Sequence, residues 1–290
     1  MTAPASDAAS AAAPAFVDLH THSTASDGSR APADVVREAQ RIGLSAIALT
    51  DHDTVAGLAE ATAAGASAGV RVVAGVELSA VEGEVETHLL GLHLRDVHTI
   101  EAALDGLRDM RRTRAERIVV KLNELGVRIT MASVLQQLGD APGAAIGRPH
   151  VARAMVAEGW ATDLRDAFDR YLGNGRAAFV QKDRLDMADA IALIHGAGGL
   201  AVLAHPAGGG TRERIESLAG IGMDGVEVRH PSHSADDVKR LMALVEQYHL
   251  VPSGGSDWHG APTGARTLGM MRVPADWLTL QDDRLRPAAA

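Results

Sequence analysis

The feature that most constrains the fold is an alternation between short apolar runs and segments with helical patterns. In chain order, the first half is expected to contain a strand at 16–20, a helix at 32–42, a strand at 45–50, a helix at 55–68 and strands at 71–76 and 88–92. Pro32 opens the first helix and Gly43 follows it, which is the usual placement of these residues. This rhythm favours parallel strands with right-handed crossovers, and therefore an α/β fold.

The rhythm is interrupted in the middle of the chain. Helical patterns without convincing strands occur at 100–125, 131–138, 149–158 and 163–172. Alternation then resumes with a helix at 186–197, strands at 200–204 and 225–228, a helix at 235–248 and a strand at 251–256. The expected organisation is a disordered extension at 1–15, a discontinuous α/β domain at 16–94 and 181–275, a helical insertion at 95–180, and a C-terminal tail at 276–290 with no assignable role.

Composition limits the chemistry that is available. The 290 residues include no Cys, so thiolate metal sites, disulfides and cysteine nucleophiles are excluded. There are 13 His, and any metal must be held by imidazoles and carboxylates. A net charge of −9 and an aromatic content of 3% argue against a broad nucleic-acid platform. With no basic leader and no apolar run of ~20 residues, a soluble protein of the cytoplasm, with no membrane or obligate protein partner, is expected.

Nearly every expected strand carries metal-type ligands at one end. They are His20, His22 and Asp27 in and after the first strand, Asp51, His52 and Asp53 after the second, Glu77 after the third, His88 at the start of the fourth, His205 after the fifth, and Asp257 and His259 after the last. Each has an ordinary alternative: a structural histidine, a turn residue, a helix cap or a surface acid. The carboxyl ends of barrel strands share one face, so these side chains are expected in one pocket. Imidazole and carboxylate suit Mn²⁺, Fe²⁺ or Zn²⁺.

Five of these segments resemble one known family. They are FVDLHTHS (16–23), LTDHDT (49–54), GVELS (75–79), AHPAG (204–208) and GSDWHG (255–260). Together they are similar to blocks of the PHP (polymerase and histidinol phosphatase) superfamily, and most of all to its stand-alone metal-dependent phosphoesterases that act on nucleotides such as 3′,5′-bisphosphates. The resemblance covers about 16–270 and implies a distorted (β/α)7 TIM-like barrel with a helical insertion over the site.

The resemblance also implies two to three divalent metal ions, with Mn²⁺ favoured over Fe²⁺, Zn²⁺ or Mg²⁺. The first would be held by His20, His22, Glu77 and Asp257, the second by Glu77, His88 and His205, and the third by Asp27, His52 and His259. A bridging hydroxide held by Glu77, His88 and Asp257 would then attack phosphorus, without a protein nucleophile.

Substrate-binding residues are expected nearby. The family resemblance assigns phosphate to Arg148 and Lys182, with His150 beside the former; solvated surface residues are the alternative. His230 follows a strand and could contact phosphate or protonate a leaving oxygen, or it could be a turn residue. Arg229 stands where relatives usually have an aromatic residue, so its role is left open between packing near a base and adding a phosphate contact.

A basic run lies on the long helix expected at 100–125. It consists of Arg108, Arg111, Arg112, Arg114 and Arg117, interleaved with acidic residues. A solvated face is the ordinary interpretation of such a run, and guidance of an RNA end toward the pocket is the other.

The expected function is hydrolysis of a phosphomonoester of a small nucleotide. The first alternative is a 5′→3′ exoribonuclease or short-RNA hydrolase that uses the same metals, with the basic run as its distinct support. Histidinol-phosphate phosphatase fits less well, because the resemblance is to the stand-alone nucleotide-type enzymes with an insertion. A non-catalytic metal-binding domain also fits less well, because all nine ligand positions are filled.

Overall fold

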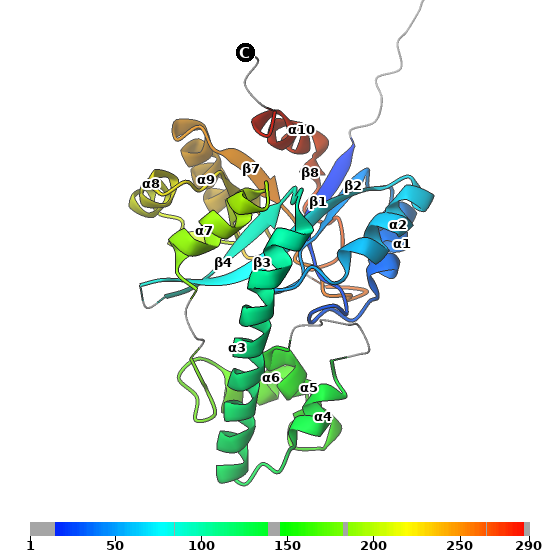
Figure 1. The fold of residues 1–290 in the computed structure, drawn as a ribbon, viewed down its shortest axis with the longest axis vertical. Coiled ribbons are helices and arrows are strands. Elements are labelled where there is room, and N and C mark those ends of the chain that lie inside the picture. Colours follow the sequence, from blue (N-terminus) through cyan, green and yellow to red (C-terminus); the bar gives the residue numbers. More distant parts are fainter. Residues whose placement is uncertain (1–14, 84, 139–145, 182–184, 265, 287–290) are drawn as a thin grey trace, which may run out of the picture.

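One mixed sheet forms the centre of the computed structural model, which describes residues 15–286 except 84, 139–145, 182–184 and 265 (Figure 1). Its strands are β1 (Phe16–Thr21), β2 (Ala46–Leu49), β3 (Arg71–Glu82), β4 (Val85–Leu92), β5 (Leu200–Leu203), β6 (Gly225–Arg229), β7 (Val251–Gly254) and β8 (Val273–Pro274). Their order is β7-β6-β5-β4-β3-β2-β1-β8. Thr21, at the end of β1, bridges Trp258 beyond β7, so the sheet nearly closes on itself.

The strand directions confirm the expected TIM-like barrel and show how it is distorted. β1, β2 and β3 run parallel, as do β5, β6 and β7. Between these sets, β4 is antiparallel to both of its neighbours, and β8 adds antiparallel to β1. All seven expected strands are present, but β3 and β4 form a long hairpin that extends beyond the apolar runs that predicted them.

Helices cover the outside of the barrel and fill the segment between β4 and β5. They are α1 (Pro32–Arg41), α2 (Leu58–Ala68), α3 (Val97–Glu124), α4 (Met131–Leu135), α5 (Arg148–Ala157), α6 (Leu164–Ala167), α7 (Met187–Gly196), α8 (Arg212–Gly220), α9 (Ala235–Gln247) and α10 (Ala275–Arg284). A π-helical turn at Phe168–Leu172 continues α6. None of the described helices is both long and apolar enough to cross a membrane.

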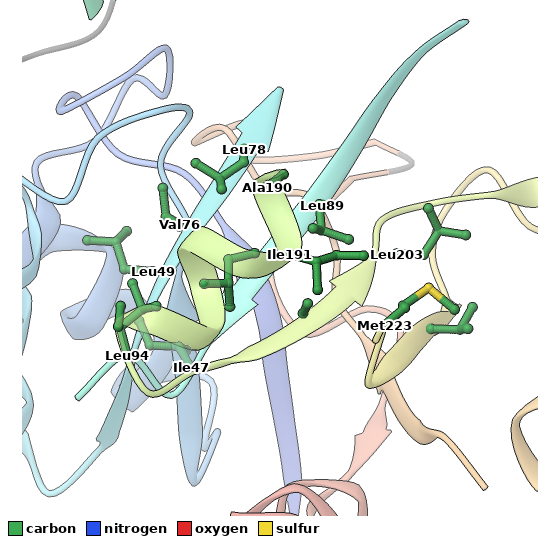
Figure 2. Close-up of a cluster of buried hydrophobic side chains, with 14 of the residues drawn as sticks. Ile47, Leu49, Val76, Leu78, Leu89, Leu94, Ala190, Ile191, Leu203 and Met223 are labelled. Atoms are coloured by element: carbon green, nitrogen blue, oxygen red, sulfur yellow. The ribbon is translucent and has the colours of Figure 1, made fainter. Parts of the chain in front are cut away.

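Alternate residues of the strands enter two hydrophobic clusters. Leu89 of β4 packs in the cluster beneath α7, with Ile191 and Leu203 (Figure 2), whereas Leu90 belongs to a cluster that includes Leu278 of α10. This period of two is what a sheet covered on both faces requires. No element was expected in the C-terminal segment. It contains the helix α10, in which Leu278 and Gln281 are buried.

The helical segment has a hydrophobic cluster of its own. α3 extends from the barrel, and α4, α5 and α6 lie along its far half (Figure 1). Ile118 and Leu122 of α3 pack there with Val151 and Met155 of α5. This segment lies at the end of the barrel opposite α10, and it is the end that bears the histidine cluster described next.

Candidate active site

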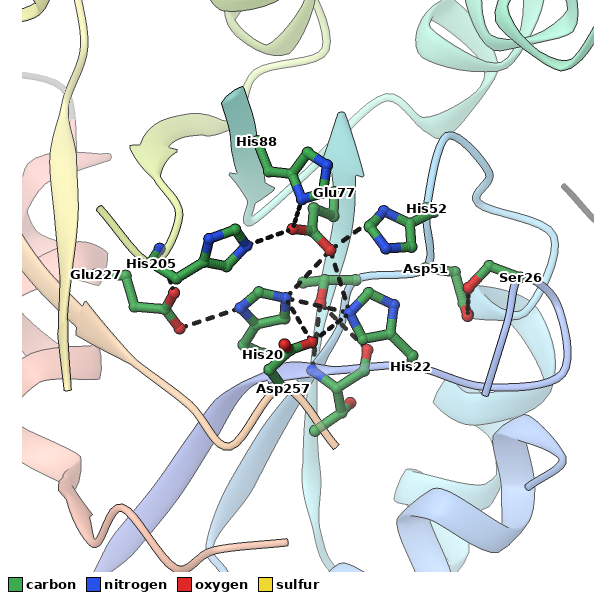
Figure 3. A network of polar contacts seen from close by, with 12 residues as sticks. His20, His22, Ser26, Asp51, His52, Glu77, His88, His205, Glu227 and Asp257 are labelled. Carbon is green, nitrogen blue, oxygen red and sulfur yellow. Dashed lines mark hydrogen bonds and ion pairs between the residues drawn. The ribbon is translucent and has the colours of Figure 1, made fainter. Parts of the chain in front are cut away.

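Glu77 is the centre of a buried cluster of imidazoles (Figure 3). It lies within β3, five residues before the strand ends, and only 1% of it is exposed. Its Oε2 lies 3.2 Å from Nε2 of His20, 3.2 Å from Nε2 of His22 and 3.3 Å from Nδ1 of His52. Its Oε1 lies 2.8 Å from Nδ1 of His88 and 3.1 Å from Nε2 of His205. One carboxylate therefore faces five histidines from four different segments of the chain.

The first group around Glu77 is completed by Asp257. The Nε2 atoms of His20 and His22 are 3.1 Å apart, and Oδ1 of Asp257 lies 3.5 Å and 3.2 Å from them. His20, His22, Glu77 and Asp257 each place one ligand atom within 4.8 Å of the others. The first expected ligand set is therefore brought together in full.

A second group forms where the loops after β1 and β2 meet the segment after β7. Asp27 Oδ1 lies 3.2 Å from Nε2 of His259, and its Oδ2 lies 4.0 Å from Nε2 of His52. His22 joins these three within the same 4.8 Å. A third group combines His52, Glu77 and His88, whereas the expected set paired His88 with His205. His52 thus lies between two of the groups.

The chemistry of these donors fits divalent cations. Burial disfavours the charged forms of both partners, yet the imidazoles of His52 and His88 hold the pKa of Glu77 well below its ordinary value. Burial likewise lowers the pKa of His22, but Asp257 and Glu77 raise it to about 10. The Nδ1 atoms of His22 and His52 are buried without a hydrogen-bond partner among the described residues. A metal ion would neutralise the negative charge of the buried carboxylates and would accept electron pairs from these ring nitrogens.

Backbone strain occurs at three residues of the site. Asp53, His205 and Asp257 have φ angles of 48°, 29° and 51°, in the left-handed region that non-glycine residues rarely occupy. Such strain persists where surrounding contacts hold it, and it gathers at functional sites. Asp53 adjoins His52, and His205 and Asp257 lie two and three residues beyond the ends of β5 and β7, so the strain lies in the turns that carry these ligands.

Three buried carboxylates support the ligands; the sequence placed Asp51 among the metal-type residues but assigned no role to Asp18 or Glu227. Asp51 accepts bonds from Ser23 and Ser26 and so orders the loop before Asp27. Asp18 accepts from the amides of Ser256 and Gly269, at the two ends of the loop that carries Asp257. Glu227 accepts from His20 and from the amide of His205. A Glu between two valines of a buried strand was the available signal for the last.

The four residues expected to bind substrate lie in different surroundings. Arg148 lines a cavity beside the cluster, and His230 lies 3.4 Å from Oδ2 of Asp257. His150 is 1% exposed, and its Nδ1 accepts from the amide of Gly147 at the start of α5, where it caps the helix. Lys182 lies outside the described residues.

Arg229 points away from the cluster. Its guanidinium lies 5.4 Å from the ring of Trp277 in α10 and donates to the carbonyl of Arg272 at 2.6 Å. Neither of the expected alternatives, base packing or a phosphate contact, has support in this position.

The basic run on α3 is only partly a solvated face. Arg112 and Arg117 are exposed, and Arg112 pairs with Glu116. Arg111 and Arg114 turn inward, and together with Arg148 they line a cavity of about 160 Å³. Asp27, His52 and His88 line the same cavity. The solvated interpretation is therefore wrong for Arg111 and Arg114, because they lie on the side of α3 that packs against other parts of the chain.

Comparison with known proteins identifies the family. The PHP domain family matches residues 18–195. The chain belongs to the PHP domain family. A 3′,5′-nucleoside bisphosphate phosphatase of Chromobacterium violaceum is 35% identical over 94% of this chain and 99% of its own. A 5′-3′ exoribonuclease of Haemophilus influenzae is 36% identical over 87% of this chain and 92% of its own.

A solved structure supports the same assignment. A candidate metal-dependent phosphoesterase of Bifidobacterium adolescentis is 31% identical, with a TM-score of 0.85 over 95% of this chain and 99% of its own. The expected family, the barrel and the class of enzyme, a metal-dependent phosphoester hydrolase, are thereby confirmed.

The buried ring of His150 leads to a prediction for stability against pH. Burial, and then the nearby Arg153, lower its pKa from 6.5 to about 4. As pH falls, His150 is therefore protonated in the unfolded chain before it is protonated in the folded protein. The contribution of the neutral His150 ring to stability is complete above pH 6.5 and is lost as pH falls toward 4. In metal-free protein, H150N is expected to remove roughly 3 kcal/mol of this pH dependence, judged by urea unfolding. The control is H98N, at a side chain that is 97% exposed; equal slopes for wild type and H150N would contradict the prediction.

Proposed function

We propose that the chain hydrolyses a phosphomonoester of a nucleotide that carries a second phosphate, such as a 3′,5′-bisphosphate. The observation that carries the proposal is the cavity lined by Arg111, Arg114 and Arg148, whose other wall is formed by the cluster residues Asp27, His52 and His88. Its volume of about 160 Å³ leaves room for a phosphate group. The name of the Chromobacterium violaceum relative supports the same class of substrate.

The metal ligands in this proposal are nine residues. They are His20, His22, Asp27, His52, Glu77, His88, His205, Asp257 and His259. We propose that they hold two to three divalent ions, of which Mn²⁺ fits the mixed imidazole and carboxylate donors. When bound, such ions activate water near neutral pH and neutralise phosphoryl oxygens. The protein's part is to hold the donors in place and to close the site over the substrate.

Arg148 is held ready for an anion. Its Nη1 donates to the carbonyl of Leu172 and, at 3.0 Å, to Oδ1 of Asn174. Its guanidinium lies 5.9 Å and 5.6 Å from the rings of Phe168 and Phe179. A guanidinium group held in this way loses little conformational entropy when it binds phosphate, and its planar N–H groups match two phosphate oxygens. We propose that Arg148 binds the phosphate that is not cleaved, with Lys182 as the second cation assigned to the substrate.

A second cavity lies over the cluster on the other side. It has a volume of about 390 Å³ and is lined by His230, Ser232 and Arg266 together with six of the cluster residues. Ser232 Oγ lies 2.8 Å from Nδ1 of His230, which leaves Nε2 directed at the cluster. We propose that His230 Nε2 supplies a proton to the leaving oxygen there. The helical segment at 95–180, which we take as an insertion, would cover this end of the barrel.

The test compares substrates and one arginine variant. With adenosine 3′,5′-bisphosphate, R148A is expected to lower kcat/KM by about 10- to 100-fold, because charge-assisted bonds contribute roughly 1.5–3 kcal/mol. With adenosine monophosphates and histidinol phosphate the expected loss is several-fold smaller. R165A is the matched control, since Arg165 is 91% exposed and pairs only with Asp169 among the described ion pairs. An equal loss for both classes of substrate would contradict a second-phosphate site at Arg148.

A 5′→3′ exoribonuclease is the second candidate. The Haemophilus influenzae relative carries that name, and a further cavity of about 340 Å³ reaches the cluster at His88 and His205 and passes Asn174 and Thr87. That open space could accept the rest of a short RNA. Stepwise shortening of 5′-phosphorylated RNA, faster than release from the bisphosphate, would move the proposal to this activity.

A further inference from the structure

Glu227 lies at the centre of β6, behind the metal-type ligands rather than among them. It is 0% exposed and belongs to none of the three groups of ligand atoms. Its neighbours Val226 and Val228 enter the hydrophobic cluster on the outer face, so Glu227 faces the barrel interior. A buried carboxylate needs partners for both oxygens.

Both oxygens of Glu227 meet ligand residues. Oε1 lies 3.0 Å from Nδ1 of His20, and Oε2 accepts the backbone amide of His205 at 2.7 Å. These two histidines lie on different sides of Glu77, since His20 faces its Oε2 and His205 faces its Oε1. One carboxylate thus contacts the ligand from β1 and the turn after β5 together (Figure 3).

We infer that Glu227 is a positioning residue that sets the tautomer of His20 and the turn at His205, and through them the affinity of the site for metal. A carboxylate only accepts hydrogen bonds, so Nδ1 of His20 must carry the proton. Nε2 then presents its lone pair to the cluster, where Glu77, His22 and Asp257 converge. The bond to His205 holds a backbone with a φ of 29°, which a non-glycine residue rarely adopts. This inference rests on the metal cluster of the proposed function.

Glutamine is the informative replacement because it has the same shape but only one accepting oxygen. If that oxygen faces His205, the amide NH2 faces Nδ1 of His20, and the proton moves to Nε2, where it blocks the ligand lone pair. If the oxygen faces His20, the NH2 group faces the backbone amide of His205. Two hydrogen-bond donors then oppose each other, where in the wild type a carboxylate oxygen accepts that amide at 2.7 Å. Either orientation damages one ligand, so no relaxed arrangement restores the cluster.

The experiment measures Mn²⁺ binding by isothermal titration calorimetry, and the tautomer of His20 by ¹⁵N NMR on metal-free protein. E227Q is expected to bind Mn²⁺ about 10- to 100-fold more weakly, as is typical when a partner of a ligating histidine is lost. E227D keeps both accepting oxygens and is expected to recover part of the affinity. E246Q, at an exposed position of α9, is the control and is expected to match wild type. Circular dichroism verifies that each variant is folded.

The outcomes separate this inference from the proposed function. Wild-type affinity and an Nδ1-protonated His20 in folded E227Q would overturn the role of Glu227 and leave the metal proposal standing. Wild-type protein that binds no Mn²⁺ would instead overturn the metal proposal. In that case the NMR result still decides the inference, because a wild-type His20 that is protonated at Nε2 and not at Nδ1 contradicts it.

Discussion

Replacing Glu77 by glutamine is expected to lower phosphate release by at least about 100- to 1,000-fold, the scale seen when a single group that stabilises the transition state is lost. Glu77 faces five imidazoles with its two oxygens, so an amide would leave several of them without a negative partner. Metal stoichiometry is expected to fall in parallel. The measurement is phosphate release with Mn²⁺ added, together with metal analysis of the same samples.

The matched control for this variant is E82Q. Glu82 ends the same strand but pairs with Nε of Arg214 at 2.7 Å, and its side chain is 34% exposed. It is expected to retain wild-type turnover. Wild-type turnover in E77Q would remove Glu77 from the centre of the site.

Replacing Arg111 by alanine is expected to lower the free energy of unfolding by about 3–5 kcal/mol, because it removes the arginine partner of the buried carboxylate of Asp53. Arg111 is 10% and Asp53 is 3% exposed, and Nε of Arg111 donates to Oδ2 of Asp53. Its Nη2 also donates to Oγ of Ser79 at 2.9 Å, so the residue ties α3 to β3 and to the loop after β2. Urea unfolding in the presence of a chelator measures the effect without metal binding.

A double-mutant cycle with D53N distinguishes the ion pair from lost packing. A smaller penalty for R111A in the D53N background than in the wild type is the expected result. R112A provides the control on the same helix, because Arg112 is 62% exposed and its pair with Glu116 is expected to contribute less than about 1 kcal/mol. A cost for R111A as small as that of R112A would show that this contact does not hold α3 to the barrel.

The sequence predicted the parts of the site that follow directly from strand ends. His20, His22 and Asp257 meet Glu77 because the end of β1 and the segment after β7 lie beside the middle of β3 in the barrel. The ligand set around His52 was harder to predict. His52 lies within reach of both Asp27 and Glu77, and no local pattern reveals which carboxylate a loop histidine will approach.

Other features depend on contacts between residues far apart in sequence. β3 extends to Glu82 because β4 pairs with it along its length, so Glu77 lies within a strand rather than at its end. Arg111 and Arg114 were indistinguishable from Arg112 by spacing alone, and only the packing of α3 against the barrel turns them inward. His150 is a residue type that can bind substrate, but its Nδ1 accepts a hydrogen bond from a backbone amide at the start of α5. Residue type alone does not reveal that a histidine caps a helix.

The most direct test of the central claim is phosphate release from adenosine 3′,5′-bisphosphate by one preparation before chelation, after chelation and after Mn²⁺ is restored. Turnover of the bisphosphate is expected to be lost on chelation, to return with Mn²⁺, and to exceed turnover of adenosine monophosphates. Turnover unaffected by complete removal of metal, or no release from the bisphosphate by protein that has bound Mn²⁺, would contradict the claim.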